Sequence, residues 1–200
     1  MRSDRLARWL AADPGSESHS LGPGATKGCA WRALLAPALA ALNELKRLGH
    51  LSEYALGGGM GAMRYTEPFA TFDLDVFFIP SVKGISAGIP GMYGYLKKMG
   101  HAVVKEGILI GGIPVQFLAT DPLTEEAVRN AHSVEYAGVK TRIITAEHLV
   151  AMAVRTGRKK DAARIEMLCG TVGIDKGRLR AILARHGLTA AYAKITGRKQ

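Results

Sequence analysis

The chain of 200 residues is long enough for one domain with its own hydrophobic core. Its 48% hydrophobic and 22% charged residues are ordinary for a folded protein and exclude a disordered chain, a collagen-like fibre and a coiled-coil rod. No apolar run approaches the roughly 20 residues that a membrane helix needs, so no membrane partner is expected. The two cysteines, Cys29 and Cys169, form no disulfide or zinc motif and favour a reducing cytoplasm.

Charge is unevenly distributed along the chain, whose net charge is +10. Residues 151–200 hold 12 Lys and Arg against 3 Asp and Glu, a balance of +9, whereas residues 51–150 hold 8 against 10, a balance of −2. A basic region beside an acidic centre favours a polyanionic partner such as a nucleoside triphosphate or RNA. A solvated basic helical surface would explain the same numbers.

The predicted elements follow a segment rich in Gly, Pro and Ser, residues 1–28, which is typical of a mobile N-terminal segment. Hydrophobic periodicity, capping residues and glycine turns then predict a succession of helices and strands. In chain order these are a helix around 30–48, a strand around 52–57, a short helix from the glycine cluster through Tyr65, a strand over FDLDVFFIP, a helix around 86–99, a hairpin over 101–119 turning near Gly111 and Gly112, a helix capped by Thr120 or Asp121, a hairpin turning at Ala137–Gly138, and three helices from Thr145 onward. The fold class is therefore α/β (α+β), with a small mixed sheet and flanking helices over 29–144 and a helical bundle over 145–200.

A glycine cluster follows the first predicted strand, at Gly57, Gly58 and Gly59. Glycines let the backbone approach an anion closely, and the first N–H groups of a helix point toward such an anion. The cluster is therefore a candidate phosphate site. Glycines at such turns also serve a purely structural purpose, and the cluster alone does not decide between the two.

Two carboxylates, Asp73 and Asp75, alternate with apolar residues on the next predicted strand. Side chains two positions apart point to the same face of a strand and lie about 6.5–7 Å apart along it. Such a pair is costly unless it is solvated or shares a cation, and carboxylate oxygens are suitable ligands for Mg²⁺. Leu74 and Val76 are expected to anchor the opposite face in the core. The alternative is a solvent-facing strand with two surface acids.

A rival motif uses the same glycines, because Gly57, Gly59 and Ala62 fit the dinucleotide fingerprint G-x-G-x-x-G/A. That fold requires a full helix, a second strand and an acid about 20 residues further on. Asp73 follows Ala62 by only 11 residues (73 − 62), and Pro68 interrupts the interval. The spacing disfavours a dinucleotide site.

The stretch GGMGAMRYTEPFATFDLD resembles minimal nucleotidyltransferases of the polymerase-beta-type fold, a group that includes AbiEii-type toxins. Their signature is a Gly-Gly or Gly-Ser pair, about a dozen residues and then acid-x-acid on the next strand; here residues 60–72, 13 in number, separate Gly58–Gly59 from Asp73–Asp75. The later stretch TAEHLVAMAVRTGRKKDAARIEML is similar to a helical segment of the same group. The resemblance covers about residues 50–170.

The resemblance implies transfer of a nucleoside monophosphate from a nucleoside triphosphate to a hydroxyl acceptor. Asp73 and Asp75 would be the catalytic pair that binds Mg²⁺ or Mn²⁺. Acceptors in such proteins include transfer RNA or other RNA, a protein hydroxyl and small molecules such as aminoglycosides, and a toxin-like role would bring an antitoxin partner. The nucleotide-binding residues would be Gly58, Gly59, Arg64, Arg158, Lys159 and Lys160, with Arg155 as a further candidate.

Two departures from the pattern leave a second function open. The group usually has a third acid on a neighbouring strand, where this chain has Gln116, and Glu106 is the nearest substitute. The helical segment often has Lys where Ala153 stands and an acid where Arg164 stands. Because Gln carries no charge and cannot act as a base, a catalytically silent nucleotide-binding or interaction module of the same fold is the alternative.

Overall fold

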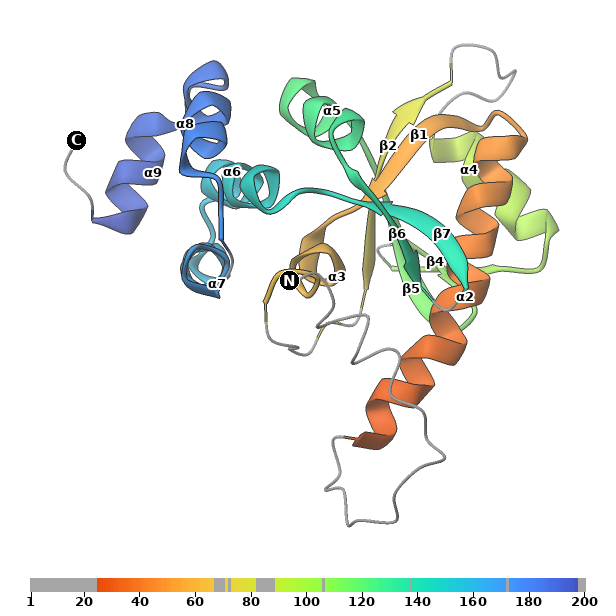
Figure 1. Cartoon of the computed structure of the whole chain (residues 1–200). Helices are drawn as coiled ribbons and strands as arrows, with labels where there is room; N and C mark the ends of the chain where they lie inside the picture. Colours follow the sequence, from red (N-terminus) through yellow and green to blue (C-terminus); the bar gives the residue numbers. More distant parts are fainter. Residues whose placement is uncertain are drawn as a thin grey trace.

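Figure 1 shows the computed structural model of the chain, which describes residues 25–66, 71, 73–81, 89–105, 107–136, 138–171 and 173–197. The side chains of residues 25–34, 159 and 171 lie outside the description. The predicted N-terminal segment 1–28 also falls largely outside the described residues. Its last four residues belong to helix α2, which begins at Ala25 and so starts earlier than predicted.

One mixed sheet forms the centre of the molecule, and its seven described strands follow the order β3-β4-β5-β2-β1-β7-β6. β1 pairs antiparallel with β2 and parallel with β7, while β2 pairs parallel with β5. The strands are β1 (Leu51–Leu56), β2 (Leu74–Pro80), β3 (Ala102–Val104), β4 (Gly107–Ile110), β5 (Ile113–Ala119), β6 (His132–Tyr136) and β7 (Val139–Ile143). The prediction of an α/β fold with a mixed sheet is confirmed.

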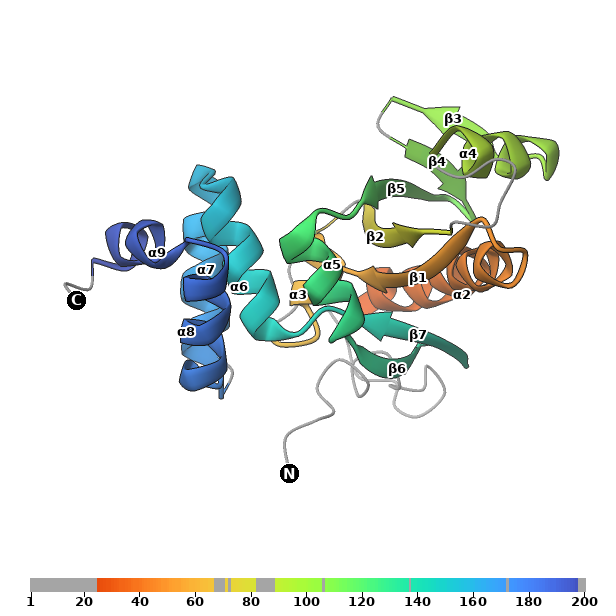
Figure 2. The same ribbon diagram turned by 90° about the horizontal axis from the view of Figure 1, so that it is seen from above.

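Helices cover both faces of this sheet, and the C-terminal helices stand beyond one of them (Figures 1 and 2). α2 and α4 bury one face in a core centred on residues such as Leu39, Val76 and Met92. The other face packs against α5 and the short helix α3, and α6 to α9 extend the same core; α5 to α9 are here called the helical half of the molecule. The described helices are α2 (Ala25–Arg47), α3 (Gly58–Ala62), α4 (Ile89–Lys98), α5 (Pro122–Arg129), α6 (Ala146–Thr156), α7 (Lys159–Thr171), α8 (Lys176–Arg185) and α9 (Thr189–Thr196).

The alternation predicted for β2 gives this strand two distinct faces. Leu74, Val76 and Phe78 are fully buried against the α2–α4 face. Phe77 and Ile79 pack into the opposite core, and Asp75 shares their side of the strand. A local sequence pattern thus turns the two carboxylates toward the helical half.

Predicted helix ends agree with the structure where a capping side chain is present. Asp121 is the N-cap of α5, where its carboxylate accepts from the Thr124 amide at 3.0 Å in a reciprocal capping box. Thr145 caps α6 through its hydroxyl oxygen, and Gly157 ends α6 in the left-handed conformation. α3 is shorter than predicted, because it ends at Ala62 and continues only as a turn to Tyr65.

Two segments divide differently from the prediction. The first limb of the hairpin predicted over 101–119 is two strands, β3 and β4, that fold back on each other. Gly107 begins β4 so close to β5 that a Cβ atom there would lie 2.2 Å from the Val115 carbonyl oxygen. A fourth C-terminal helix, α9, follows the three that were predicted. None of the described helices is both long and apolar enough to cross a membrane.

Candidate active site

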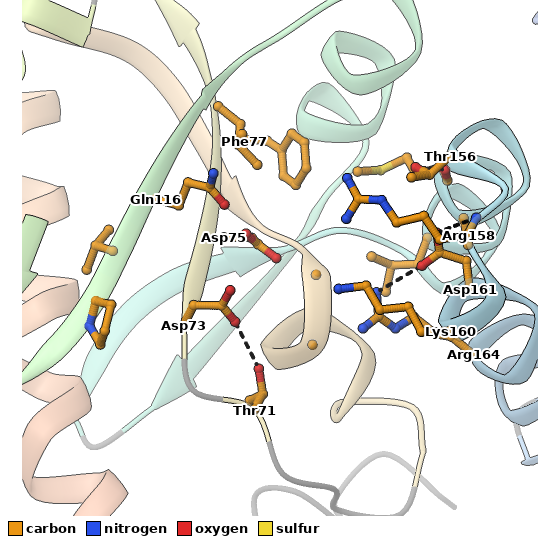
Figure 3. A pocket seen from close by; sticks show the side chains of 18 of the residues that line it. Thr71, Asp73, Asp75, Phe77, Gln116, Thr156, Arg158, Lys160, Asp161 and Arg164 are labelled. Carbon is orange, nitrogen blue, oxygen red and sulfur yellow. Dashed lines mark hydrogen bonds and ion pairs between the residues drawn. The ribbon is translucent and has the colours of Figure 1, made fainter. Parts of the chain in front are cut away.

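A pocket of about 1160 Å³ lies between the sheet and the helical half, and it contains both predicted carboxylates. One wall, here called the sheet wall, is formed by β2 and β5 with the glycine turn, residues 57–59, whose last two glycines begin α3. The opposite wall, here called the helical wall, is formed by α6 and α7 (Figure 3). The segments brought together here are far apart in the sequence.

Asp75 on β2 and Asp73, the residue just before this strand, both project into the pocket (Figure 3). Asp73 is exposed, and its carboxylate accepts a hydrogen bond from the Thr71 hydroxyl at 3.2 Å. Asp75 is half-buried and lies deeper, beside the glycine turn. The pair therefore places one solvated and one partly desolvated carboxylate side by side.

The glycine turn touches Asp75 directly. The Gly57 amide donates to the Asp75 carbonyl oxygen at 2.9 Å, which joins the turn to β2. Gly58 has φ of +55°, and a Cβ atom built on it would lie 1.6 Å from Asp75 Oδ2. Only glycine meets both requirements, since other residues rarely adopt this conformation and would displace the carboxylate. Gly58 and Gly59 both line the pocket.

Burial and charge together perturb Asp75. Partial burial, followed by the negative charge of Asp73, raises the pKa of Asp75 from 3.8 to about 6, against the opposing effect of Arg164, Lys160 and Arg158. The ionised form is thus held at a cost that a cation between the two carboxylates would remove. Perturbed groups of this kind concentrate at functional sites.

Three cations on or just before α7 face the carboxylates across the pocket: Arg158, Lys160 and Arg164. Arg158 and Lys160 are exposed, whereas Arg164 is half-buried. Asp161 lies among them and is 4% exposed. Its carboxylate accepts from the Arg158 amide at 3.2 Å and lies 3.8 Å from Arg164 Nη1. The part of the helical wall that lines the pocket therefore presents a net positive surface, and Asp161 is engaged locally.

Gln116 occupies the position on β5 that faces Asp75 in the parallel register, and it also lines the pocket. The residue singled out as replacing a third acid is therefore a direct neighbour of the carboxylate pair. The other proposed substitute, Glu106, lies outside the described residues. The pocket also has an apolar part, to whose lining Phe77, Leu118 and Met152 contribute.

Several predicted residues lie elsewhere. Arg64 is not among the residues that line the pocket. It lies near Tyr65 and Tyr136, where its positive charge opposes the rise in pKa that burial causes in both tyrosines. Arg155 forms an ion pair of 2.6 Å with Asp121 at the start of α5. The Lys159 side chain lies outside the described part of the structure.

Sequence reasoning missed three charged residues of the pocket: Lys105, Asp161 and Arg164. For Arg164 a usable signal existed, because it lies four residues after Lys160 and therefore on the same face of a helix. Asp161 likewise lies three residues after Arg158. Lys105 follows strand β3, and nothing in the local sequence predicts its direction.

A metal ion could not be held by this chain's acids and imidazoles alone within the described residues, because no three His, Cys, Asp or Glu side chains group closely enough. The pocket's side-chain oxygen donors include Asp73, Asp75 and the Gln116 amide, a set that suits a hard cation such as Mg²⁺ with further ligands from a bound phosphate.

Comparison with known proteins places the fold. No protein-family model matches the sequence, and no curated protein matches it. Among solved structures, an antigenic nucleotidyltransferase-like protein from Paracoccidioides brasiliensis is similar, with a TM-score of 0.51, 14% identity, and coverage of 80% of this chain and 92% of that one. The fold is nucleotidyltransferase-like. ANT(2'')-Ia, in a complex with adenylyl-2''-tobramycin, matches with a TM-score of 0.46 and 16% identity over 84% of this chain and 97% of that one.

Proposed function

We propose that this protein is a metal-dependent nucleotidyltransferase, which transfers a nucleoside monophosphate from a nucleoside triphosphate to a hydroxyl acceptor. One observation carries the proposal. Asp73 and Asp75 share a pocket with the Gly58–Gly59 backbone and lie opposite the cations of the helical wall. This combination offers ligands for a divalent cation and a separate positive surface for a polyphosphate.

The residues fit Mg²⁺ or Mn²⁺. The raised pKa of Asp75, caused first by burial and then by Asp73, reflects a desolvation cost and a charge repulsion that a divalent ion would offset. Asp73 and Asp75 would hold the ion, with the Gln116 amide oxygen as a neutral neighbour. When bound, such an ion neutralises charge on the α-phosphate and on the departing pyrophosphate.

The chain's own residues would bind and orient the substrate. Amides of Gly58 and Gly59 at the first turn of α3 would donate to phosphate oxygens, and Lys160 and Arg164 would neutralise the outer phosphates. The acceptor oxygen would attack the α-phosphorus in line as the bond to pyrophosphate breaks, and the hydroxyl proton would pass to solvent or to the departing pyrophosphate. Catalysis would rest on positioning and electrostatics, because the pocket supplies no charged third ligand beside Asp75 among the described residues.

The acceptor is proposed to be RNA, transfer RNA included, because residues 151–200 carry an excess of nine positive charges. A protein hydroxyl and a small molecule are the other acceptor classes. An AbiEii-like role with an antitoxin partner rests on the resemblance of the GGMGAMRYTEPFATFDLD stretch alone.

A second function is favoured by Gln116. The neighbour of Asp75 in the parallel register is neutral, and such a site would bind a nucleotide without transferring it. This silent module and the enzyme share the same pocket, so a binding experiment alone does not separate them.

The deciding experiment labels acceptors directly. The protein is incubated with each α-³²P-labelled nucleoside triphosphate, Mg²⁺ and a cell extract, and the labelled macromolecule is identified by nuclease and protease treatment. Asp73→Asn and Asp75→Asn are expected to abolish labelling. Glu135→Gln, which removes an exposed strand carboxylate on β6 away from the pocket, is the matched control and is expected to label like the wild type.

Three outcomes are informative. Labelling that survives both aspartate substitutions contradicts the catalytic assignment. Magnesium-dependent nucleotide binding without labelling favours the silent module. Salt-sensitive binding of RNA, with neither labelling of any acceptor nor binding of a nucleotide, contradicts both.

A further inference from the structure

The helical wall of the pocket is held in place indirectly. α7, which carries Lys160 and Arg164, packs chiefly on α6 and α9. α6 in turn packs on α5 and α3, and α5 packs on β1 and β2 (Figure 2). The distance between the α7 cations and the carboxylates therefore depends on how α6 and α8 are attached to α5.

The carboxylate of Glu126, in the middle of α5, is the meeting point of three side chains from the helical half. Arg185 at the end of α8 donates to it from Nε at 3.0 Å and from Nη2 at 2.7 Å. His186 Nε2 lies 2.8 Å from the same carboxylate, within hydrogen-bond distance. His148 Nε2 of α6 lies 3.4 Å away, and this imidazole is 1% exposed.

The partners of Glu126 are themselves fixed. The Thr145 hydroxyl lies 2.8 Å from His148 Nδ1, which orients the imidazole toward α5. The Asp175 amide, before α8, donates to Glu147 Oε1 of α6 at 3.1 Å, so α8 and α6 are also joined to each other. Hydrogen bonds from Arg185, the largest effect, lower the pKa of Glu126 to about 2. The carboxylate thus remains ionised throughout the neutral range.

The cluster is satisfied as an ionic network. Arg185 occupies both oxygens of Glu126, and within the described residues no group of three acids or imidazoles is arranged to hold a metal ion. The cluster therefore attaches α5 to α6 and α8, and it is not arranged to bind a ligand.

We propose that Glu126 is a positioning residue for the nucleotide. Through Arg185, His186 and His148 it fixes the helical wall relative to the sheet wall, and thereby sets the distance of the α7 cations from Asp73 and Asp75. The inference rests on the proposed nucleotidyl transfer. A shift of the helical wall would move the cations that bind the outer phosphates, and it would therefore weaken binding of the nucleoside triphosphate.

The test is a double-mutant cycle between Glu126→Gln and Lys160→Gln, which do not contact each other. Glu126→Gln keeps the size of the side chain and removes its charge, and it is expected to raise the KM for the nucleoside triphosphate by about three- to tenfold. If Glu126 acts through the α7 cations, its effect on KM is expected to shrink to less than about twofold when Lys160 is already Gln. If Glu126 instead has a purely structural role, the two substitutions are expected to change KM by factors that multiply in the double variant.

Controls separate this inference from loss of folding and from the proposed function. Glu125 lies next in sequence on α5, and its ion pair in the described structure is with Arg129 of the same helix, at 2.7 Å, so Glu125→Gln is expected to behave like the wild type. Arg185→Gln removes the partner from the exposed side and is expected to reproduce the rise in KM if Glu126→Gln folds poorly. The inference is overturned if the effects of Glu126→Gln and Lys160→Gln on KM multiply, or if Glu125→Gln raises KM as much as Glu126→Gln does. Neither result contradicts nucleotidyl transfer by the wild type. Absence of wild-type transfer and nucleotide binding overturns the proposed function itself.

Discussion

The two walls of the pocket are built by different means. On the sheet wall, Asp75 is placed by backbone pairing, with Gln116 in register on one side and the Gly57 amide on the other. On the helical wall, Lys160 and Arg164 are placed by helices that reach the sheet through α5 and through ion pairs such as Asp121–Arg155. The carboxylates thus have a stiff support, and the cations have an adjustable one.

This difference indicates how each wall responds to change. Backbone pairing in a buried sheet is cooperative, so a change that disturbs it moves the carboxylates or unfolds the strand. Exposed ion pairs contribute little to stability and are weakened by salt, so changes there alter geometry by degrees. Substitutions on the sheet wall are expected to have all-or-none effects and those on the helical wall graded ones.

After substitution of the two carboxylates themselves, the largest effect on activity is expected from Gly58→Ala. The new Cβ atom would fall 1.6 Å from Asp75 Oδ2, and the residue would have to keep a φ of +55°. We expect activity to fall by at least about 100-fold because the carboxylate is displaced, and the free energy of unfolding to fall by about 1–2 kcal/mol. Enzyme assay and chemical denaturation measure the two.

Gly94→Ala is the control for this change. Gly94 lies in α4, and no atom of the described residues would come within 4 Å of a methyl group added there, so activity is expected to be unchanged. Stability is expected to rise by about 0.5–1 kcal/mol, because Ala favours a helix more than Gly does. Wild-type activity in Gly58→Ala would show that the close contact between the glycine turn and Asp75 is dispensable.

A substitution on the same wall is expected to trade function for stability. Asp75→Asn removes a carboxylate whose pKa is raised from 3.8 to about 6, chiefly by burial. The ionised wild-type group destabilises the fold above that pKa, so the variant is expected to be more stable at pH 7.5 by up to about 3 kcal/mol. This gain in stability is expected to fall as the pH drops through 6 and to vanish below 3.8, where the Asp75 carboxyl is neutral in both the folded and the unfolded wild type.

The measurement is urea unfolding across this pH range with chelator present, so that no divalent ion masks the repulsion. Asp73→Asn should give a smaller gain, since it removes only the charge that acts on Asp75 and leaves the burial. Equal stability of wild type and Asp75→Asn at pH 7.5 would mean that burial and the charge of Asp73 do not destabilise the ionised Asp75 carboxylate.

The sheet wall could be predicted from sequence because its causes are local. Alternation of Leu74 and Val76 with the two acids turns the carboxylates to one face, and both apolar residues are fully buried as expected. The division of the neighbouring segment into β3 and β4 could not be predicted in this way. Gly107, which begins β4, is required by its close contact with Val115 on β5, and that contact is not local in the sequence.

The helical wall could be predicted only in part, because its partners are distant. Arg155 looked available for phosphate, yet it pairs with Asp121 from another helix. Arg185 meets Glu126 across 59 residues of sequence. Helical spacing shows which residues share a face, but it does not show which opposite charge will meet them.

The smallest effect is expected from Lys160→Gln, on the adjustable wall. Lys160 is exposed and lines the pocket, so its contact with a phosphate is partly screened by water. We expect the KM for the nucleoside triphosphate to rise by about three- to tenfold with little change in kcat, and the difference from wild type to narrow as salt is increased. Lys176→Gln removes an exposed lysine of α8 outside the pocket lining and is the control. A kcat that collapses in Lys160→Gln with an unchanged KM would place this lysine on the reacting phosphate itself, and the helical wall would then be as exacting as the sheet wall.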